Sequence, residues 1–429
     1  ERYSVEGFYY ALREETYDQA IEKIAKHIEL TGEIASHHVL ARRLFLLERV
    51  DEAITHWEIV TRMQHPLWMA YNQLASAYEY QQRFDIAYEL IESFMTRFPD
   101  RAEVYAGLGE HWIRAGKYDA AIEAFETAEA TDPDRPGTHF GRFELGILRE
   151  GWREAEAAMK PLTSLRSPTS KWEALRRLAL VSLYRGKAAD ALELLDQAAS
   201  AYEYPRTRSA AARTQAARVL LAQGEAERAL ELARSAQREG EGNYPEWEGL
   251  FYEASALAAS GRIHEAEARA AKLLERTESM PTQKETRRHH HLVGEIALAR
   301  DEPQAAIVEL EKARSLLLPR GFTLMGRDPP PHVPIWYSLG LAYLAAGRDG
   351  EALVWFERIT ESEGEHIWWP IPYVRSFYFL GRIHESLGDQ EAASGNYRRF
   401  HELWKDGDLD RERIEETREK LTRIASSRG

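Results

Sequence analysis

Apolar residues recur along the chain in the pattern of paired amphipathic helices. The clearest pair lies in residues 336–356, where Trp336 and Tyr343 are seven positions apart and share one face of a predicted helix. Between them, Gly340 removes a side chain and lets a second helix come close, with Ala352 as its small contact residue. Phe356, one turn further, fills the remaining gap. This stretch therefore predicts two antiparallel helices joined by a short turn.

The same pattern can be followed from the start of the chain. The second-helix alanines Ala20, Ala53, Ala87 and Ala121 follow one another at a stride of about 34 residues. The first unit is irregular, because Phe8 stands where a small residue is expected. Past residue 136 the pattern loosens, and in units six to nine the stride lengthens to about 37 to 46 residues, with close helix contacts that rely on alanine more than on aromatic side chains.

This recurring pattern predicts an all-α chain of about eleven helix pairs in one continuous solenoid. We divide it into residues 1–135 with four units, 136–332 with five longer and degenerate units, and 333–429 with two units. Residues 410–424 form an amphipathic, highly charged pattern, and we expect this last helix to cover the final apolar face. Glycines recur at the predicted turns, where a left-handed backbone favours them: Gly116, Gly186, Gly224, Gly261, Gly347 and Gly388.

Residues 336–343, with Ala352 and Phe356, resemble the signature of the tetratricopeptide repeat. The resemblance is strong in the third, fourth, tenth and eleventh units and rests on spacing elsewhere. It implies a right-handed superhelix whose first helices line a concave groove, and it implies that a protein or peptide partner binds in that groove.

Composition narrows the expected partners and location. The chain has 429 residues and no cysteine, and the lack of cysteine excludes disulfides. Its net charge of −14 repels phosphate backbones and argues against nucleic acid as the main partner. No apolar run approaches the roughly 20 residues of a membrane span, so we expect a cytoplasmic location. The sequence begins at Glu1 without methionine, which indicates a fragment or a processed form.

Catalytic and metal-binding patterns are sparse. Phosphate-binding glycine loops and nucleophile motifs are absent from the sequence, so we expect neither an enzyme nor a bound cofactor. The run His289–His291, with Glu295 four residues after the last histidine, could place two metal ligands on one helical face. No third ligand can be assigned, and ordinary helix neighbours explain the run more simply.

The groove-facing positions of the first helices are the candidate partner-binding residues. Arginine and tyrosine, which carry much of the binding energy at interfaces, are frequent among them. The set is Arg42, Asn72, Tyr80, Arg114, Arg176, Arg177, Tyr184, Arg218, Tyr252, Tyr337, Tyr378 and Arg382. A solvated inner face with ordinary packing is the alternative interpretation for each residue.

Two segments depart from the regular repeat. Residues 316–334 carry three consecutive prolines and lengthen the connection between two units, either as a packed spacer or as a functional loop. Residues 365–373 contain Trp368 and Trp369, which would form a recognition surface if exposed and would seal neighbouring units together if buried.

The end of the chain, from Tyr397 to Asp408 and the helix after it, looks like the closing segment of repeat regions attached to bacterial serine/threonine kinases and winged-helix regulators. That resemblance implies a catalytic or DNA-binding domain before Glu1. Two functions follow: a non-catalytic scaffold that docks a protein within a larger bacterial signalling protein, or a sensor domain that binds a small molecule.

Overall fold

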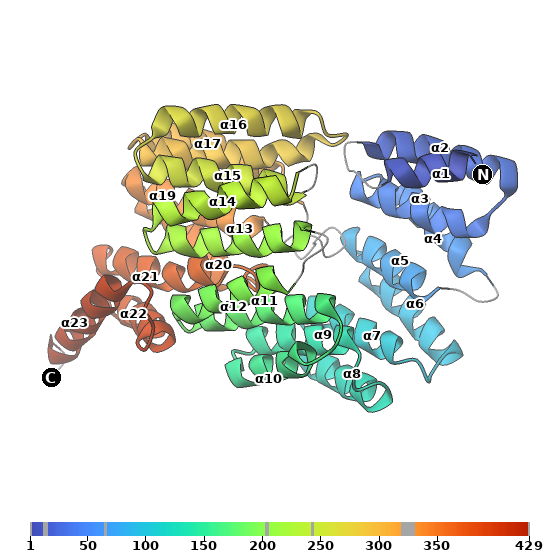
Figure 1. Ribbon diagram of the computed structural model, residues 1–429. Helices are drawn as coiled ribbons and strands as arrows, with labels where there is room; N and C mark the ends of the chain where they lie inside the picture. Colours follow the sequence, from blue (N-terminus) through green and yellow to red (C-terminus); the bar gives the residue numbers. More distant parts are fainter. Residues whose placement is uncertain are drawn as a thin grey trace. The chain divides into compact units, whose positions relative to one another are not determined.

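The computed structural model describes residues 2–11, 16–63, 67–201, 206–241, 244–318 and 331–427, and within these ranges it is helical throughout, with 23 α-helices and no strand (Figure 1). The first eight helices are α1 (Arg2–Tyr10), α2 (Tyr17–Thr31), α3 (Ile34–Leu46), α4 (Val50–Thr61), α5 (Trp68–Tyr80), α6 (Phe84–Arg97), α7 (Ala102–Arg114) and α8 (Tyr118–Thr131). The next eight are α9 (Pro136–Leu148), α10 (Trp152–Thr163), α11 (Pro168–Tyr184), α12 (Ala188–Ser200), α13 (Thr207–Ala222), α14 (Ala226–Glu239), α15 (Tyr244–Ala259) and α16 (Ile263–Glu278). The last seven are α17 (Arg287–Ala299), α18 (Pro303–Ser315), α19 (His332–Ala345), α20 (Asp349–Thr360), α21 (Pro370–Ser386), α22 (Gln390–Trp404) and α23 (Arg411–Ser427).

The helices α1 to α22 follow one another as eleven pairs, and α23 is the additional terminal helix. Partners such as α3 and α4 or α21 and α22 pack together, and successive pairs stack, as α4 does on α5. This order confirms the predicted α-solenoid of paired helices with a C-terminal cap. The proline-rich connection predicted at 316–334 falls mostly outside the described residues, because residues 319–330 are not among them.

Glycine makes the closest approach within the helix pairs, as the sequence predicted. A Cβ atom on Gly340 would lie 2.8 Å from the Phe356 ring, and one on Gly381 would lie 2.5 Å from the Tyr397 ring. Ala352 is fully buried beside this contact. A larger side chain at either glycine would have to displace a buried aromatic ring.

The predicted turn glycines all adopt positive φ, from 69° at Gly116 to 82° at Gly388. Where a pair has no glycine at the turn, another residue takes the same conformation; the cases are Glu48, Gln82, Glu150 and Asp301. The turn geometry therefore belongs to the repeat itself, and glycine is the residue that adopts it with least strain.

The first pair differs from the predicted frame by one position. Gly7, not Phe8, is the small residue at the helix contact: Gly7 is buried, and a Cβ there would lie 2.7 Å from the Ile24 side chain. Phe8 turns outward and is 49% exposed. The irregularity in the sequence was thus a shift in register.

The chain divides into two compact units. The first contains residues 1–145 and two short later segments, and the second contains the remaining residues. In the first unit, neighbouring pairs pack in chain order from α1 to α8, around a core that includes Trp57, Leu74 and Ile91.

The second unit has contacts between its two ends in addition to its stacked pairs. Helix α11 packs against α21, and the Trp404 indole at the end of α22 donates a hydrogen bond to the Leu183 carbonyl at 3.1 Å. The Asp408 carboxylate accepts the backbone N–H groups of Ala188 and Ala189 at 2.6 and 3.0 Å, and so caps the start of α12. We call this contact, made by Trp404 and Asp408 with residues 183–189, the clasp.

The terminal helix α23 packs on α22, as predicted for a cap. Glu416 accepts a hydrogen bond from the Tyr378 hydroxyl at 2.6 Å, and Lys420 pairs with Glu385. Ile414 and Ile424 on α23 are buried. The cap therefore combines buried apolar side chains with charged groups that stay near water.

Candidate functional site

The inner face of the first unit carries a buried polar network between α5 and α7. Glu79 and His111 are both fully buried, with Glu79 Oε1 2.5 Å from His111 Nδ1. The Arg114 guanidinium donates to Glu79 Oε2 at 2.8 Å, and Asn72 lies 3.0 Å from His111 Nε2. Burial alone would raise the pKa of Glu79, but Arg114 and His111 outweigh burial and hold that pKa below its usual value. The predicted residues Asn72 and Arg114 are thus brought together by a carboxylate and an imidazole that the sequence analysis did not select.

Two further predicted residues lie on neighbouring first helices of this unit. The Tyr80 hydroxyl donates to Glu48 at 3.2 Å, and its ring packs edge-on to Phe45. Arg42 is half-buried on α3, near His38. Burial, together with the charge of Arg42, lowers the pKa of His38 to about 4, so this imidazole is neutral at pH 7.

In the second unit, the segment between α20 and α21 covers predicted groove residues. Trp368 lies over the guanidinium groups of Arg176 and Arg177, with 5.6 and 4.9 Å to the ring centroid. Trp369 lies 4.3 Å from the guanidinium of Arg218. These distances are typical of cation–π contacts. Trp369 is buried and Trp368 half-buried, so the two tryptophans pack inside the unit.

Hydrogen bonds hold the same segment in place. The Tyr184 hydroxyl donates to the His366 carbonyl at 2.7 Å, and Arg218 donates to the Trp368 carbonyl at 3.1 Å. Burial raises the pKa of Tyr184 well above its usual value, so the phenol keeps the proton that it donates. At α11 and α13 the inner face therefore binds a segment of its own chain.

The remaining predicted residues lie on α15, α19 and α21. Tyr252 is buried, Tyr337 is half-buried, and the Tyr378 hydroxyl bonds to α23 as described above. Arg382 is exposed, with its guanidinium 6.0 Å from the Tyr378 ring. The structure thus spreads the predicted residues over both units, and no single cluster contains them all.

The three consecutive histidines have three different partners. His289 Nδ1 lies 2.9 Å from the Ala270 carbonyl, His290 Nδ1 lies 2.8 Å from Glu309, and His291 Nε2 lies 3.0 Å from the Ser338 hydroxyl. Consecutive residues point about 100° apart around a helix, which separates these rings. Among the described residues, no three histidine or carboxylate groups converge as metal ligands would.

A second polar cluster lies on the first helices α15, α17 and α19. Glu295 accepts a hydrogen bond from the Ser255 hydroxyl at 2.9 Å, and its other oxygen is 3.4 Å from His291 Nε2. Burial raises the pKa of Glu295 to about 7, although hydrogen bonds from Ser255 and Ser338 oppose the shift. Burial and the charge of Arg288 lower the pKa of His291 to about 3, so His291 is neutral at pH 7.

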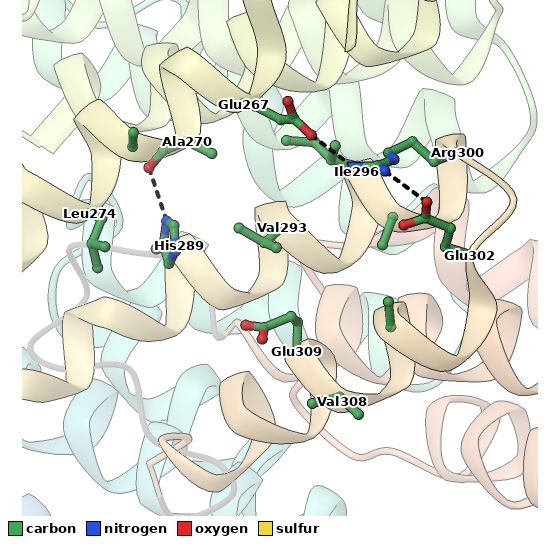
Figure 2. Close-up of a pocket in the computed structure, with 13 residues that line it drawn as sticks. Glu267, Ala270, Leu274, His289, Val293, Ile296, Arg300, Glu302, Val308 and Glu309 are labelled. Atoms are coloured by element: carbon green, nitrogen blue, oxygen red, sulfur yellow. Dashed lines mark hydrogen bonds and ion pairs between the residues drawn. The ribbon is translucent and has the colours of Figure 1, made fainter. Parts of the chain in front are cut away.

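The second unit also has a groove of about 510 Å³ between α16, α17 and α18. Figure 2 shows Val293, Ile296 and Val308 along it, with the Glu267–Arg300–Glu302 ion pairs at one end and His289 at the other. Arg300 lies 2.9 Å from Glu267 and 2.8 Å from Glu302. The volume of the groove is in the range of small-ligand pockets.

Sequence reasoning missed Glu79, His111 and Asp408. The first two lie 32 positions apart, close to one repeat length, so a buried polar pair at equivalent places in neighbouring first helices was the available signal. For Asp408 no local signal existed, since its contacts lie about 220 residues away in sequence.

Comparison with known proteins supports the repeat. Residues 72–136, which run from α5 to the start of α9, match the family model of the tetratricopeptide repeat. No curated protein matches the sequence. Among the described residues, none of the helices has both the length and the apolar character needed to cross a membrane.

Several solved structures are similar to this chain. A tetratricopeptide repeat protein from Parabacteroides merdae ATCC 43184 is 18% identical over 67% of this chain and 98% of that one, with a TM-score of 0.37. Yeast Tom70 is 10% identical over 96% and 92%, with a TM-score of 0.44. The human IFIT1 dimer with m7Gppp-AAAA is 14% identical over 96% and 86%, with a TM-score of 0.45.

Proposed function

We propose that this tetratricopeptide repeat protein is a non-catalytic scaffold that binds a protein or peptide segment on the inner faces of its first helices. The observation that carries the proposal is the set of part-accessible side chains Asn72, Tyr80 and Arg114 on adjacent first helices. Their partners hold them in place before any ligand arrives: Arg114 is fixed by Glu79, and Tyr80 by Glu48. Side chains that are already ordered lose little entropy on binding.

The finer parts of this proposal come from the sequence. The net charge of −14 favours a protein partner over nucleic acid, and we place the protein in the cytoplasm. The resemblance of residues 397–408 to bacterial regulators supports a docking or regulatory role within a larger signalling protein. Gel filtration and fractionation of the native host would test location and assembly together.

Site-specific photo-crosslinking tests the groove. We would place a benzophenone side chain at Tyr80 or Arg42 on the inner face, and at the exposed Glu123 on α8 as a control. The proposal expects one protein to be captured from both inner positions and not from Glu123. Capture of the same protein from all three positions, or from none, would contradict binding on the inner face of this unit.

The groove between α16 and α18 favours a second candidate, a sensor domain for a small molecule. A ligand at one hundred times its dissociation constant would stabilise the fold by about 2.7 kcal/mol. Val293→Trp would fill the groove, while Val354→Trp on the exposed face of α20 is the matched control. A metabolite whose thermal shift persists in Val293→Trp would rule out this groove as its site.

A further inference from the structure

Glu295 differs from Glu253 and Asp410, two other acids of the second unit. Glu253 lies 3.0 Å from Arg234 and 3.1 Å from Arg269. Asp410 lies 2.7 Å from both Arg375 and Arg413. Each of these carboxylates thus faces two guanidinium groups, which offset the cost of removing its charge from water.

Among the residues that the structure describes, no guanidinium or ammonium group forms an ion pair with Glu295. Its partners are the hydroxyl groups of Ser255 and Ser338 and the imidazole of His291, which is neutral. About 32% of its side chain remains accessible, so a ligand can reach the carboxylate. Hydroxyl groups orient the two oxygens but supply no positive charge. The carboxylate is therefore held in position with its charge uncompensated.

The surroundings suit a cation on an apolar stem. The Phe251 ring lies 5.2 Å from the His291 ring and is part-accessible on α15, next to Tyr252. Aromatic faces accommodate the methylene stem of a long basic side chain and attract its charged end. Other charged and titratable groups also act here: Tyr252 on α15 feels Glu248, Glu295 and Arg218 of α13, and His291 feels Arg288 on α17.

We propose that Glu295, oriented by Ser255 and Ser338, is the anchor of a subsite that binds the ammonium or guanidinium group of a lysine or arginine in the partner segment. This deepens the proposed scaffold function and rests on it. A charge-assisted hydrogen bond to the carboxylate would replace the missing ion pair. The partner segment is thereby expected to carry a basic residue at the position that reaches α17.

Binding at this subsite has an expected pH dependence. A cation lowers the pKa of the carboxylate that it pairs with, and Glu295 starts from a pKa of about 7. Binding therefore releases a proton below pH 7, and affinity rises between pH 6 and pH 8. His291 stays neutral in that range, so the pH dependence of binding is expected to come from Glu295.

The test uses the full chain with carboxyl-labelled glutamate, followed by NMR. The probes are a blocked nonapeptide of alanines with one central lysine, the same peptide with norleucine, and n-butylammonium chloride. The lysine peptide is expected to shift the Glu295 carboxyl resonance and to bind at least tenfold more tightly than the norleucine peptide. Glu295→Gln should abolish this preference and its pH dependence, while Glu363→Gln, at an exposed position, should retain both.

Three results would overturn the subsite. They are equal binding of the lysine and norleucine peptides, an unchanged preference in Glu295→Gln, and n-butylammonium binding as tightly as the lysine peptide, which would assign the site to free amines. The scaffold is tested separately. If a partner is captured on the inner face and Glu295→Gln leaves its affinity unchanged, the subsite alone is refuted. If the lysine peptide binds but no partner is captured on the inner face, the scaffold alone is refuted.

Discussion

The two compact units differ in how far apart in sequence their contacting residues can lie. In the first unit, the polar contacts join adjacent pairs: Glu79 reaches His111 and Arg114, which are 32 and 35 positions away. In the second unit, Trp404 bonds to Leu183 across 221 positions, and Arg218 bonds to Trp368 across 150. Nearest-neighbour contacts make stability a sum over repeats, whereas end-to-end contacts couple distant repeats.

The comparison also explains which inner face stays available. In the first unit, groove residues such as Asn72, Tyr80 and Arg114 bond to residues of neighbouring repeats and remain part-accessible to a ligand. In the second unit, the 365–369 segment covers α11 and α13, and the inner face that remains includes Glu295 on α17. We infer that the effect of a local change stays within neighbouring repeats in the first unit and reaches distant repeats in the second.

Removing the clasp is the strongest test of this difference between the two units. Trp404 is fully buried, so Trp404→Ala is expected to cost about 3–5 kcal/mol of unfolding free energy. Hydrogen exchange should increase in α11 and α12, because their turn loses its distant partner. Trp57→Ala, equally buried in the first unit, should lose similar stability with faster exchange only in α3 to α5. Exchange that stays local in Trp404→Ala would refute the coupling.

The buried ion network of the first unit is the next test. Glu79→Gln leaves the Arg114 charge without its carboxylate, and we expect a loss of about 2–4 kcal/mol at pH 7. The pKa of Glu79 is held low, so its stabilisation is present above the usual carboxyl range and disappears as pH falls through the folded pKa. The variant and wild type should therefore converge in acid. Glu253→Gln is the control, with a smaller loss because Arg234 and Arg269 are each about 40% exposed, at 41% and 38%.

Widening a helix pair should cost about the same in both units. Gly340→Leu and Gly109→Leu each drive a side chain into a buried ring, Phe356 in one case and Phe125 in the other. Overpacking of this kind typically costs about 1–3 kcal/mol. Thermal unfolding would measure the loss for both. An unchanged melting temperature for Gly340→Leu would mean that the contact is not as close as the structure shows.

The fold could be predicted because it repeats. Gly340 and Ala352 define a stride that recurs, and a recurring stride fixes helix pairs even where single units are degenerate. The same rule failed locally at Gly7, because one register shift in an isolated unit leaves no second repeat to correct it.

The candidate sites were harder to predict for a physical reason. A position facing the groove is fixed by helical periodicity, but whether Arg177 or Tyr184 meets solvent depends on a segment about 180 residues later. The helical periodicity of the sequence does not indicate that this distant segment packs against α11. Whether the predicted groove residues bind a partner stays a prediction.

Two acids with raised pKa values allow a comparison of the two units with a smaller expected change in stability. Burial raises the pKa of Glu110 in the first unit and of Glu295 in the second to about 7. Each raised pKa contributes stability that is present below the usual carboxyl pKa and is lost as pH rises to about 7. Glu295→Gln and Glu110→Gln should each flatten this decline and gain about 1–2 kcal/mol at pH 8, after allowance for solvent. Chemical denaturation between pH 4 and pH 8 would show it, and an unaltered pH profile in Glu295→Gln would contradict the raised pKa.

The smallest expected effect concerns turns without glycine. Gln82 and Asp301 occupy the same turn position in the two units, with φ of 62° and 59°, and both are exposed. Glycine relieves roughly 1–2 kcal/mol of left-handed strain but gives back about 0.4–1 kcal/mol of unfolded-chain entropy. Gln82→Gly should therefore stabilise the first unit by about 0.5–1 kcal/mol. Aspartate tolerates this conformation better, so Asp301→Gly should change the second unit little. Denaturant midpoints of the two variants would measure the difference, and a larger gain at Asp301 would show that the strain at these turns depends on the unit and not on the residue.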